Sequence, residues 1–152
     1  MRNFIWWIFY IFAAIWLQKF APGLDALAPG LIICMQERNR QQSILFLLVC
    51  IVLQEGCGTL PFGASIIWYG LVFSFFYMGG WFFMAENRFF IMILSLALGI
   101  GRLFMFLGMG ALQPLPLDTQ ALWWQCAAQA VFTPVIWAVS GYSRHKFCGE
   151  AD

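Results

Sequence analysis

Charged residues are scarce in this chain. Asp, Glu, Lys and Arg make up 10% of its 152 residues, whereas 62% are hydrophobic and 19% are aromatic. With a mean hydropathy of +0.80, this composition lies far outside the range of soluble domains. No stretch is polar enough to form a second, soluble domain, and a net charge of +1 favours no nucleic-acid partner. The sequence therefore predicts an integral membrane protein with a single transmembrane domain over residues 1–152.

The chain also lacks the residue patterns of enzymes and cofactor-binding proteins. His145 is the single histidine and lies in a basic tail, and there is no phosphate loop or dinucleotide motif. The five cysteines form no CxxC pair. Cys34, Cys50 and Cys126 lie inside apolar runs, a position typical of small packing residues. We therefore expect no enzymatic activity, no cofactor and no metal site.

Six apolar segments follow one another at about residues 4–20, 24–37, 42–55, 62–85, 89–112 and 120–142. The last three are long enough to span, since about 20 helical residues cross a hydrocarbon core of about 30 Å, and the first reaches that length if Gln18 and Lys19 snorkel. The second and third are too short alone, so we expect a tight helical hairpin whose irregular outer ends are buried in protein. The predicted fold class is all-α, a six-helix transmembrane bundle with a short second and third helical hairpin.

A signal peptide is an alternative interpretation of the N-terminus. Residues 26–28, with the sequence Ala-Leu-Ala, could form a cleavage site after the first apolar segment. Pro29 directly follows that site, and the stretch before it is long. Both features favour a first membrane helix instead.

Basic residues predict the orientation of the six segments. With both termini in the cytoplasm, Lys19 alone falls outside, and six cations fall inside: Arg2, Arg38, Arg40, Arg88, Arg144 and Lys146. This is a strong positive-inside bias. The same orientation places two groups of tryptophans in interfacial belts, Trp6, Trp7 and Trp81 at the inner face and Trp16, Trp123 and Trp124 at the outer.

One further cation, Arg102, stands in the middle of the fifth segment. An ionisable group there costs about 2.5 kcal/mol or more on insertion scales unless it is compensated. Helical rise places Arg102 about 20 Å above the cytoplasmic start of its segment, in the outer half of the bilayer. Glu55, at the outer end of the third segment, reaches a similar depth. We therefore predict that Glu55 neutralises Arg102 inside the bundle.

Other polar residues are expected in the same layer. Gln125, Gln129 and Thr133 recur at i, i+4 and i+8, so they share one helical face, which should point inward. Gln54 and Tyr69 have compatible depths, and the small residues Ser95 and Gly99 leave room for a neighbouring helix beside Arg102. The sequence predicts a polar cluster of Glu55, Arg102, Gln125 and Gln129. A static polar core is the favoured interpretation, and a ligand pocket, an ion path and a catalytic site are the alternatives.

Three sequence patterns resemble those of the rod shape-determining membrane protein MreD family. They are "LQKFAPGLDALAPGL" after the first segment, "LQEGCGTLPFG" before the fourth, and a last segment containing "AVFTPVIWAV" with a short basic tail. The matching features are Leu17 and Gln18, Pro22 and Pro29, Glu55 with Gly58 and Gly63, and Pro134. Glu55 replaces the more usual Asp, and Arg102 is not typical of the family.

The resemblance implies a six-helix fold similar to that of energy-coupling-factor transporter S-components, in a protein of the bacterial inner membrane. It also implies a non-enzymatic scaffold or adaptor role in the elongation complex for lateral wall (peptidoglycan) synthesis and cell shape. The implied partners, besides membrane lipid, are an MreC-like periplasmic scaffold, an MreB-like actin homologue and wall-synthesis enzymes.

Two other functions stay open. A vitamin-type capture subunit would need paired small residues on one face of its first helix, whereas residues 4–17 have only the adjacent Ala13 and Ala14, with Tyr10 and Leu17 at the flanking positions. The other is a general membrane-insertion or assembly factor.

Overall fold

The computed structural model describes residues 2–21, 23–37, 39–56, 63–82, 87–112 and 119–148. In this part of the chain 92% of the residues are helical and there are no strands. The six helices are α1 (Arg2–Phe20), α2 (Ala28–Gln36), α3 (Arg40–Gly56), α4 (Ala64–Phe82), α5 (Arg88–Leu112) and α6 (Thr119–Cys148). The predicted all-helical class and the six helices are confirmed.

The prediction of six membrane spans is not matched by the helices themselves. By length and composition, three helices can cross a membrane, within Asn3–Phe20, Ala64–Phe82 and Arg88–Ala111. Helices α2 and α3 have nine and 17 residues. Helix α6 has 30 residues, but its Gln, Ser and Thr side chains and its basic last turn lower its hydropathy. The second and third segments are therefore helices too short to span, and the sixth is a long helix that is not apolar enough.

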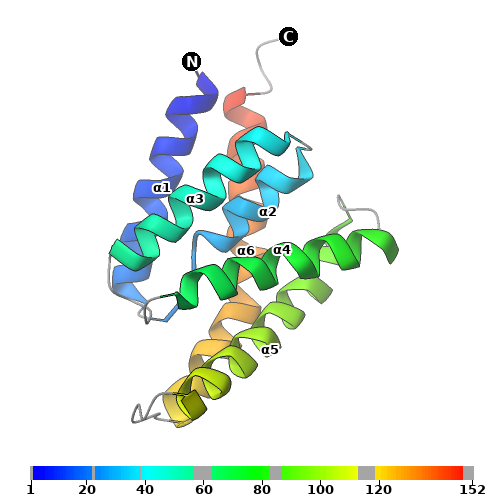
Figure 1. Cartoon of the computed structure of the whole chain (residues 1–152). Helices are drawn as coiled ribbons and strands as arrows, with labels where there is room; N and C mark the ends of the chain where they lie inside the picture. Colours follow the sequence, from blue (N-terminus) through cyan, green and yellow to red (C-terminus); the bar gives the residue numbers. More distant parts are fainter. Residues whose placement is uncertain are drawn as a thin grey trace.

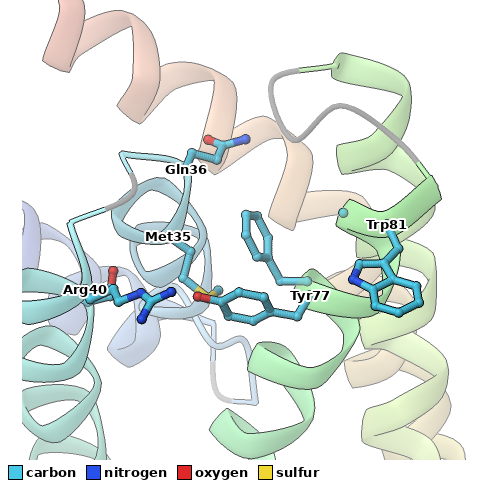
Figure 2. Close-up of a pocket in the computed structure, with 8 residues that line it drawn as sticks. Met35, Gln36, Arg40, Tyr77 and Trp81 are labelled. Carbon is cyan, nitrogen blue, oxygen red and sulfur yellow. The ribbon is translucent and has the colours of Figure 1, made fainter.

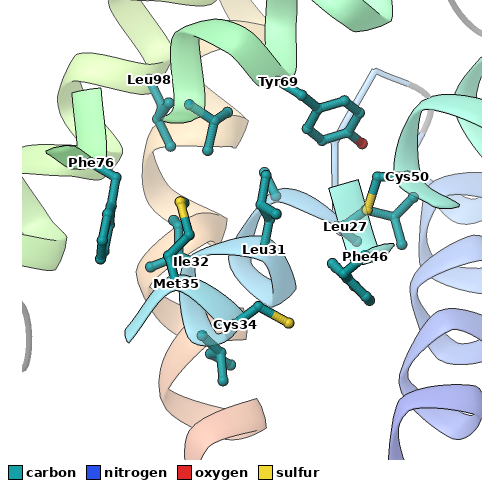
Figure 3. Packing of buried hydrophobic residues seen from close by; sticks show 14 of the residues in the cluster. Leu27, Leu31, Ile32, Cys34, Met35, Phe46, Cys50, Tyr69, Phe76 and Leu98 are labelled. Carbon is teal, nitrogen blue, oxygen red and sulfur yellow. The ribbon is translucent and has the colours of Figure 1, made fainter. Parts of the chain in front are cut away.

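The short helix α2 forms the centre of the fold (Figure 1). Nine residues at about 1.5 Å each cover only about half of a hydrocarbon core, and every residue from Ala28 to Met35 is buried. Figure 3 shows Leu31, Ile32 and Met35 of α2 among side chains from the surrounding helices, including Phe46 of α3 and Leu98 of α5. Burial by neighbours is what permits a helix too short to span.

Glycine and proline determine how α2 begins. Pro29 lies in the first turn of α2. Backbone N–H groups there have no acceptor within the helix, so the missing N–H of proline costs no hydrogen bond. A Cβ on Gly30 would lie 2.3 Å from Cε1 of Tyr10, so only glycine lets α1 approach this closely. The Tyr10 hydroxyl then donates a 2.7 Å hydrogen bond to the carbonyl oxygen of Ala26. These contacts hold the irregular residues before α2 against α1.

Helices α5 and α6 pack side by side as an antiparallel pair (Figure 1). At Gly99 an added Cβ would lie 3.0 Å from both the carbonyl oxygen of Cys126 and the Cβ of Ala130. The small residues predicted beside Arg102 do therefore admit the neighbouring helix. Cys34, Cys50 and Cys126 are buried and free, which confirms their predicted packing role.

Several helix ends gather in two groups, one near the described termini and one around Asp25. Trp6 contacts Ser143, and Gln36 contacts Trp137, so the start of α1, the end of α2 and the end of α6 lie together. In the other group, the end of α1 and the end of α3 meet through Asp25, which bonds to both Gln18 and Gln54. Both described termini therefore lie at one end, the terminal end of the bundle (Figure 1).

Candidate functional site

The buried polar centre of the bundle is built on Asp25, in the irregular segment before α2. This residue is only 2% exposed. Five donors converge on its Oδ1 atom, namely the backbone N–H groups of Leu27 and Ala28 and the side chains of Gln18, Gln54 and Tyr69, at 2.9 to 3.3 Å. The indole N–H of Trp68 donates to Oδ2 at 2.6 Å. A buried carboxylate is stable only with such partners.

Gln129 of α6 fastens the backbone of Asp25 through both ends of its amide group. Its Oε1 accepts the N–H of Asp25 at 2.7 Å, and its Nε2 donates to the carbonyl oxygen of Asp25 at 3.1 Å. The same Nε2 donates to Oγ1 of Thr133, whose hydroxyl donates to the carbonyl oxygen of Gln129 at 2.6 Å. Gln129 and Thr133 are fully buried. Their face of α6 points inward, as the i, i+4, i+8 spacing predicts.

Arg102 of α5 completes the centre without touching the carboxylate of Asp25. Its Nη1 donates to Oε1 of Gln129 at 3.0 Å, and its guanidinium lies 5.2 Å from the ring centre of Trp68. Trp68 therefore presents its ring face to the cation and its N–H to the anion. Gln129 and Trp68 bridge the two charges, and the centre joins all six helices. Nε of Arg102 is buried and has no hydrogen-bond partner in the described structure.

The predicted pair of Glu55 and Arg102 is wrong. Glu55 lies near the end of α3, and its Oε1 accepts the backbone N–H of Gly63, just before α4, at 3.0 Å. Among the described residues the one ion pair joins Glu37 to Arg144. Arg102 has Asp25 as its nearby acid instead, because the irregular segment before α2 carries Asp25 to the depth of Arg102, whereas Glu55 is used to link two helix ends.

The other predicted polar residues take different places. Gln54 and Tyr69 both bind Asp25, so their predicted depth is right. Gln125 is half-buried and lies against Gly23, where an added Cβ would be 2.5 Å from Cδ of Gln125. Of the four predicted cluster residues, the structure brings Arg102 and Gln129 together, leaves Gln125 beside them, and separates Glu55 from them.

Asp25, which lies in the stretch of residues 22–30 predicted to be irregular at the start of the second segment, was missed because only Glu55 was placed at the depth of Arg102. Two signals could have identified it. An acid within "APGLDALAPGL" stands a few residues before Pro29, which is the pattern of a capped helix start. It is also an acid inside a segment assigned to the membrane, which by itself marks a polar site.

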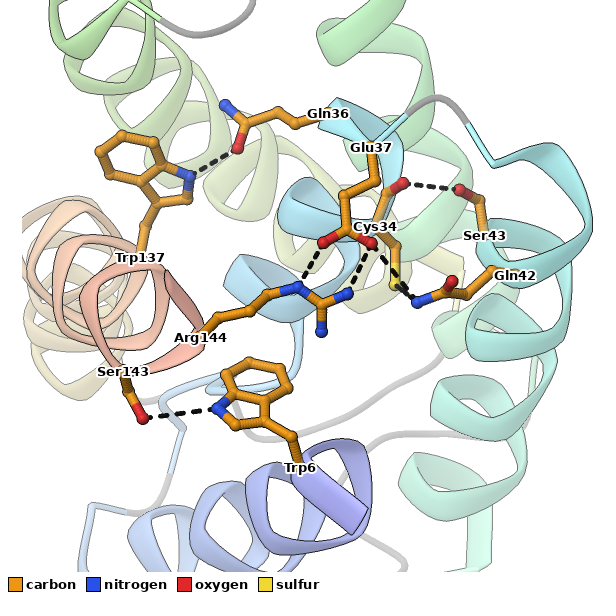
Figure 4. Close-up of polar contacts among 9 residues, drawn as sticks. All are labelled: Trp6, Cys34, Gln36, Glu37, Gln42, Ser43, Trp137, Ser143 and Arg144. Atoms are coloured by element: carbon orange, nitrogen blue, oxygen red, sulfur yellow. Dashed lines mark hydrogen bonds and ion pairs between the residues drawn. The ribbon is translucent and has the colours of Figure 1, made fainter. Parts of the chain in front are cut away.

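A second polar cluster lies at the terminal end of the bundle (Figure 4). Arg144 of α6 binds both carboxylate oxygens of Glu37, at the end of α2. The guanidinium of Arg144 also lies 5.0 and 4.7 Å from the ring centres of Trp6 and Trp7. These two tryptophans are buried against neighbouring side chains at this end of the bundle. The cluster fastens α1 and α6 to the end of α2.

The described residues form no group of three or more His, Cys, Asp or Glu side chains that could hold a metal ion. Four cavities of about 410 to 560 Å³ lie between helices, and Asp25, Arg102 and Gln129 line none of these four. Comparison of the chain with protein-family models, curated proteins and solved structures gives no match. The resemblance to the MreD family therefore rests on the sequence patterns alone.

Proposed function

We propose that this chain is an integral membrane scaffold or adaptor, without enzymatic activity, in a bacterial complex for cell shape and lateral wall synthesis. The observation that carries the proposal is the way the buried polar groups are used. Asp25, Gln54, Tyr69 and Gln129 are bonded to one another and to backbone groups. A centre arranged in this way supports a rigid fold that acts through its outer surfaces.

The outer surface supports a membrane location. Large apolar side chains are exposed on the helices that are long enough to span, among them Phe12 on α1, Met78 on α4 and Phe104 on α5. Exposed apolar side chains of this kind fit contact with lipid or with a partner helix. The gathering of both described termini at one end is compatible with two cytoplasmic termini in the bacterial inner membrane, the orientation that the basic residues favour.

A vitamin-capture subunit has less support. Ala13 is exposed on α1, whereas Ala14 is buried. Tyr10, one turn before Ala14, is also buried, and its hydroxyl donates to the carbonyl oxygen of Ala26. The first helix therefore offers no pair of small residues on one outward face. Tight binding of a vitamin by the purified protein would favour this function over the scaffold.

Co-purification tests the scaffold function. The tagged chain is expressed in its own host, membranes are solubilised, and the eluate is probed for the MreC-like and MreB-like proteins of the same genome. We expect both to be recovered, and we expect cells depleted of the chain to become round. The Asp25→Ala variant, which dismantles the polar centre, is the negative control. Normal cell width after depletion, with neither partner recovered, would contradict the proposal.

A further inference from the structure

A cavity of about 410 Å³ opens between the α2–α3 hairpin and the last turns of α4. Its apolar floor is formed by Met35 and Phe76, which are buried. Polar and aromatic groups stand at its rim: Arg40 at the start of α3, and Tyr77 and Trp81 near the end of α4. In Figure 2 the guanidinium of Arg40 and the hydroxyl of Tyr77 point toward one another across the cavity, and the indole of Trp81 turns outward.

Arg40 is the charged residue of this cavity, and it is available for a ligand. It is exposed, and the one ion pair among the described residues, between Glu37 and Arg144, does not involve it. No acid among the described residues lines the cavity with it. An arginine that has no counter-ion in the described part of the chain, beside a tyrosine hydroxyl, provides the donors that bind a phosphate group, because a guanidinium can offer two parallel N–H groups to its oxygens.

The aromatic residues place this cavity at the edge of a membrane. Trp81 is 92% exposed and Tyr77 is 51% exposed, and amphipathic rings of this kind concentrate where lipid headgroups begin. The ring of Tyr77 is held in place, since its centre lies 4.6 Å from that of Phe73 and 5.9 Å from that of Phe76. A cationic rim above an apolar floor therefore matches a molecule with an anionic head and an apolar tail.

A second cavity repeats the same combination of residues. It has a volume of about 560 Å³ and is lined by Arg88 at the start of α5 and by Tyr142 and Trp137 of α6. Trp137 donates to Gln36, next to the first cavity, so both cavities belong to the terminal end of the bundle. The indole N–H of Trp137 is used in that bond, whereas no described residue accepts from Trp81. The first cavity is therefore the better equipped of the two.

We propose that the cavity bordered by Arg40, Tyr77 and Trp81 binds an anionic phospholipid, with its phosphate on Arg40 and Tyr77 and an acyl chain along Met35 and Phe76. The site requires the membrane location of the proposed function but not its role in wall synthesis. Its occupancy would fasten the α2–α3 hairpin to the end of α4, two elements that are otherwise joined here mainly by apolar contact.

Two substitutions test the site by different routes. Arg40→Gln removes the charge, and Lys146→Gln removes one charge from the same end of the bundle outside the cavity. Gly80→Leu fills the cavity, because an added Cβ at Gly80 meets no atom within 4 Å. Gly70→Leu is its control, since Gly70 is an exposed glycine on the same helix, also with nothing within 4 Å, and does not line the cavity.

The purified proteins are titrated with phosphatidylglycerol and, separately, phosphatidylcholine in detergent, and bound lipids are counted by native mass spectrometry. We expect phosphatidylglycerol to bind the unchanged protein and both controls about tenfold more tightly than it binds Arg40→Gln or Gly80→Leu, as the loss of a charge-assisted contact implies. Phosphatidylcholine should bind all variants weakly. Equal binding of the two lipids, or equal affinity of Arg40→Gln and Lys146→Gln, would overturn the site.

Two further measurements separate the possible failures. Millimolar inorganic phosphate should not displace the lipid, and full displacement would assign the cavity to a free anion instead. Alkaline carbonate extraction should leave the chain in the membrane pellet. Release into the supernatant would overturn the membrane location and the lipid site together, whereas a chain that stays in the pellet without lipid selectivity would overturn the site alone.

Discussion

An acid, an arginine and tryptophan occur together twice in this protein, once in the buried polar centre and once at the terminal end. In the centre, Gln129 and Trp68 stand between Asp25 and Arg102. At the terminal end, Glu37 and Arg144 meet directly. The side chains of Arg144 and Glu37 are 12% and 32% exposed, whereas Asp25 and Arg102 are 2% and 5% exposed as residues.

The difference shows how solvent access changes what an ion pair needs. Near the surface, both side chains keep part of their exposure to water, so direct contact is sufficient, and only Nη1 of Arg144 is buried without a hydrogen-bond partner among the described atoms of the pair. In the interior, each ion loses its hydration, and many donors and acceptors must replace it. The centre therefore draws side chains from five helices and a backbone N–H group from α2. The terminal cluster involves only the residues around Arg144. We expect substitutions in the buried polar centre to lower the free energy of unfolding strongly, and substitutions in the terminal cluster to lower it less.

Replacing Asp25 with Ala should have the largest effect. The substitution removes the acceptor of the Trp68 and Leu27 N–H groups and the acid near Arg102. Breaking a buried charged network in this way costs about 3–5 kcal/mol in free energy of unfolding. Denaturation in detergent micelles measures it, with Glu55→Ala as the matched control for loss of an acid. A cost below about 1 kcal/mol would contradict the claim that the network around Asp25 stabilises the fold.

Replacing Arg102 with Met should have the next largest effect. Met keeps apolar contact with Trp68 and Phe106 but loses the hydrogen bond to Gln129. We expect the free energy of unfolding to fall by about 2–3 kcal/mol, the value of a hydrogen bond from a charged group. Because the site is buried, salt should change this difference little. Lys146→Met, an exposed change of the same kind, should cost almost nothing.

Replacing Arg144 with Lys should have a smaller and salt-dependent effect. Lys keeps the charge but cannot bind both oxygens of Glu37 or stack its head on Trp6 and Trp7. The expected cost is about 1 kcal/mol. Denaturation at low and high salt measures it, and the difference should shrink in high salt. A cost as large as that of Arg102→Met would remove the distinction between the two regions.

Replacing Glu55 with Gln should have the smallest effect. The amide oxygen of Gln can still accept the N–H of Gly63, so the link between the ends of α3 and α4 persists. We expect the free energy of unfolding to stay within about 0.5 kcal/mol. Glu55→Ala, which removes the acceptor, should cost more than Glu55→Gln. If both cost the same large amount, the charge of Glu55 would matter after all.

Much of the helical arrangement could be predicted because it depends on local composition. Long apolar runs predict α4 and α5, and the spacing of Gln129 and Thr133 predicts the inward face of α6. The short α2 is harder, because its burial depends on the helices packed around it rather than on its own sequence. Neither the spacing of polar residues nor the length of an apolar run in the sequence indicates which helices will surround α2.

The partner of Arg102 could not be deduced from depth alone. Glu55 and Asp25 both lie near the same end of the bundle, and a depth estimate treats each segment as a straight helix. The chain departs from a helix at residues 23–27, with Gly23 at a φ of +94°, and this turn brings Asp25 inward. The burial of Trp6 and Trp7 was missed for a similar reason, because their contact with Arg144 joins opposite ends of the sequence.

A pair of double-mutant cycles tests the central claim most directly, that Asp25 and not Glu55 balances Arg102. The free energy of unfolding is measured for Asp25→Ala, Glu55→Gln and Arg102→Met, and for each acid variant combined with Arg102→Met. We predict that Asp25→Ala and Arg102→Met together cost about 1–3 kcal/mol less than the sum of their separate costs, because removing the second charge relieves the first. In the Glu55 cycle, the cost of the double variant should equal the sum of the two single costs within about 0.5 kcal/mol. Additive costs in the Asp25 cycle with coupling in the Glu55 cycle would contradict the account.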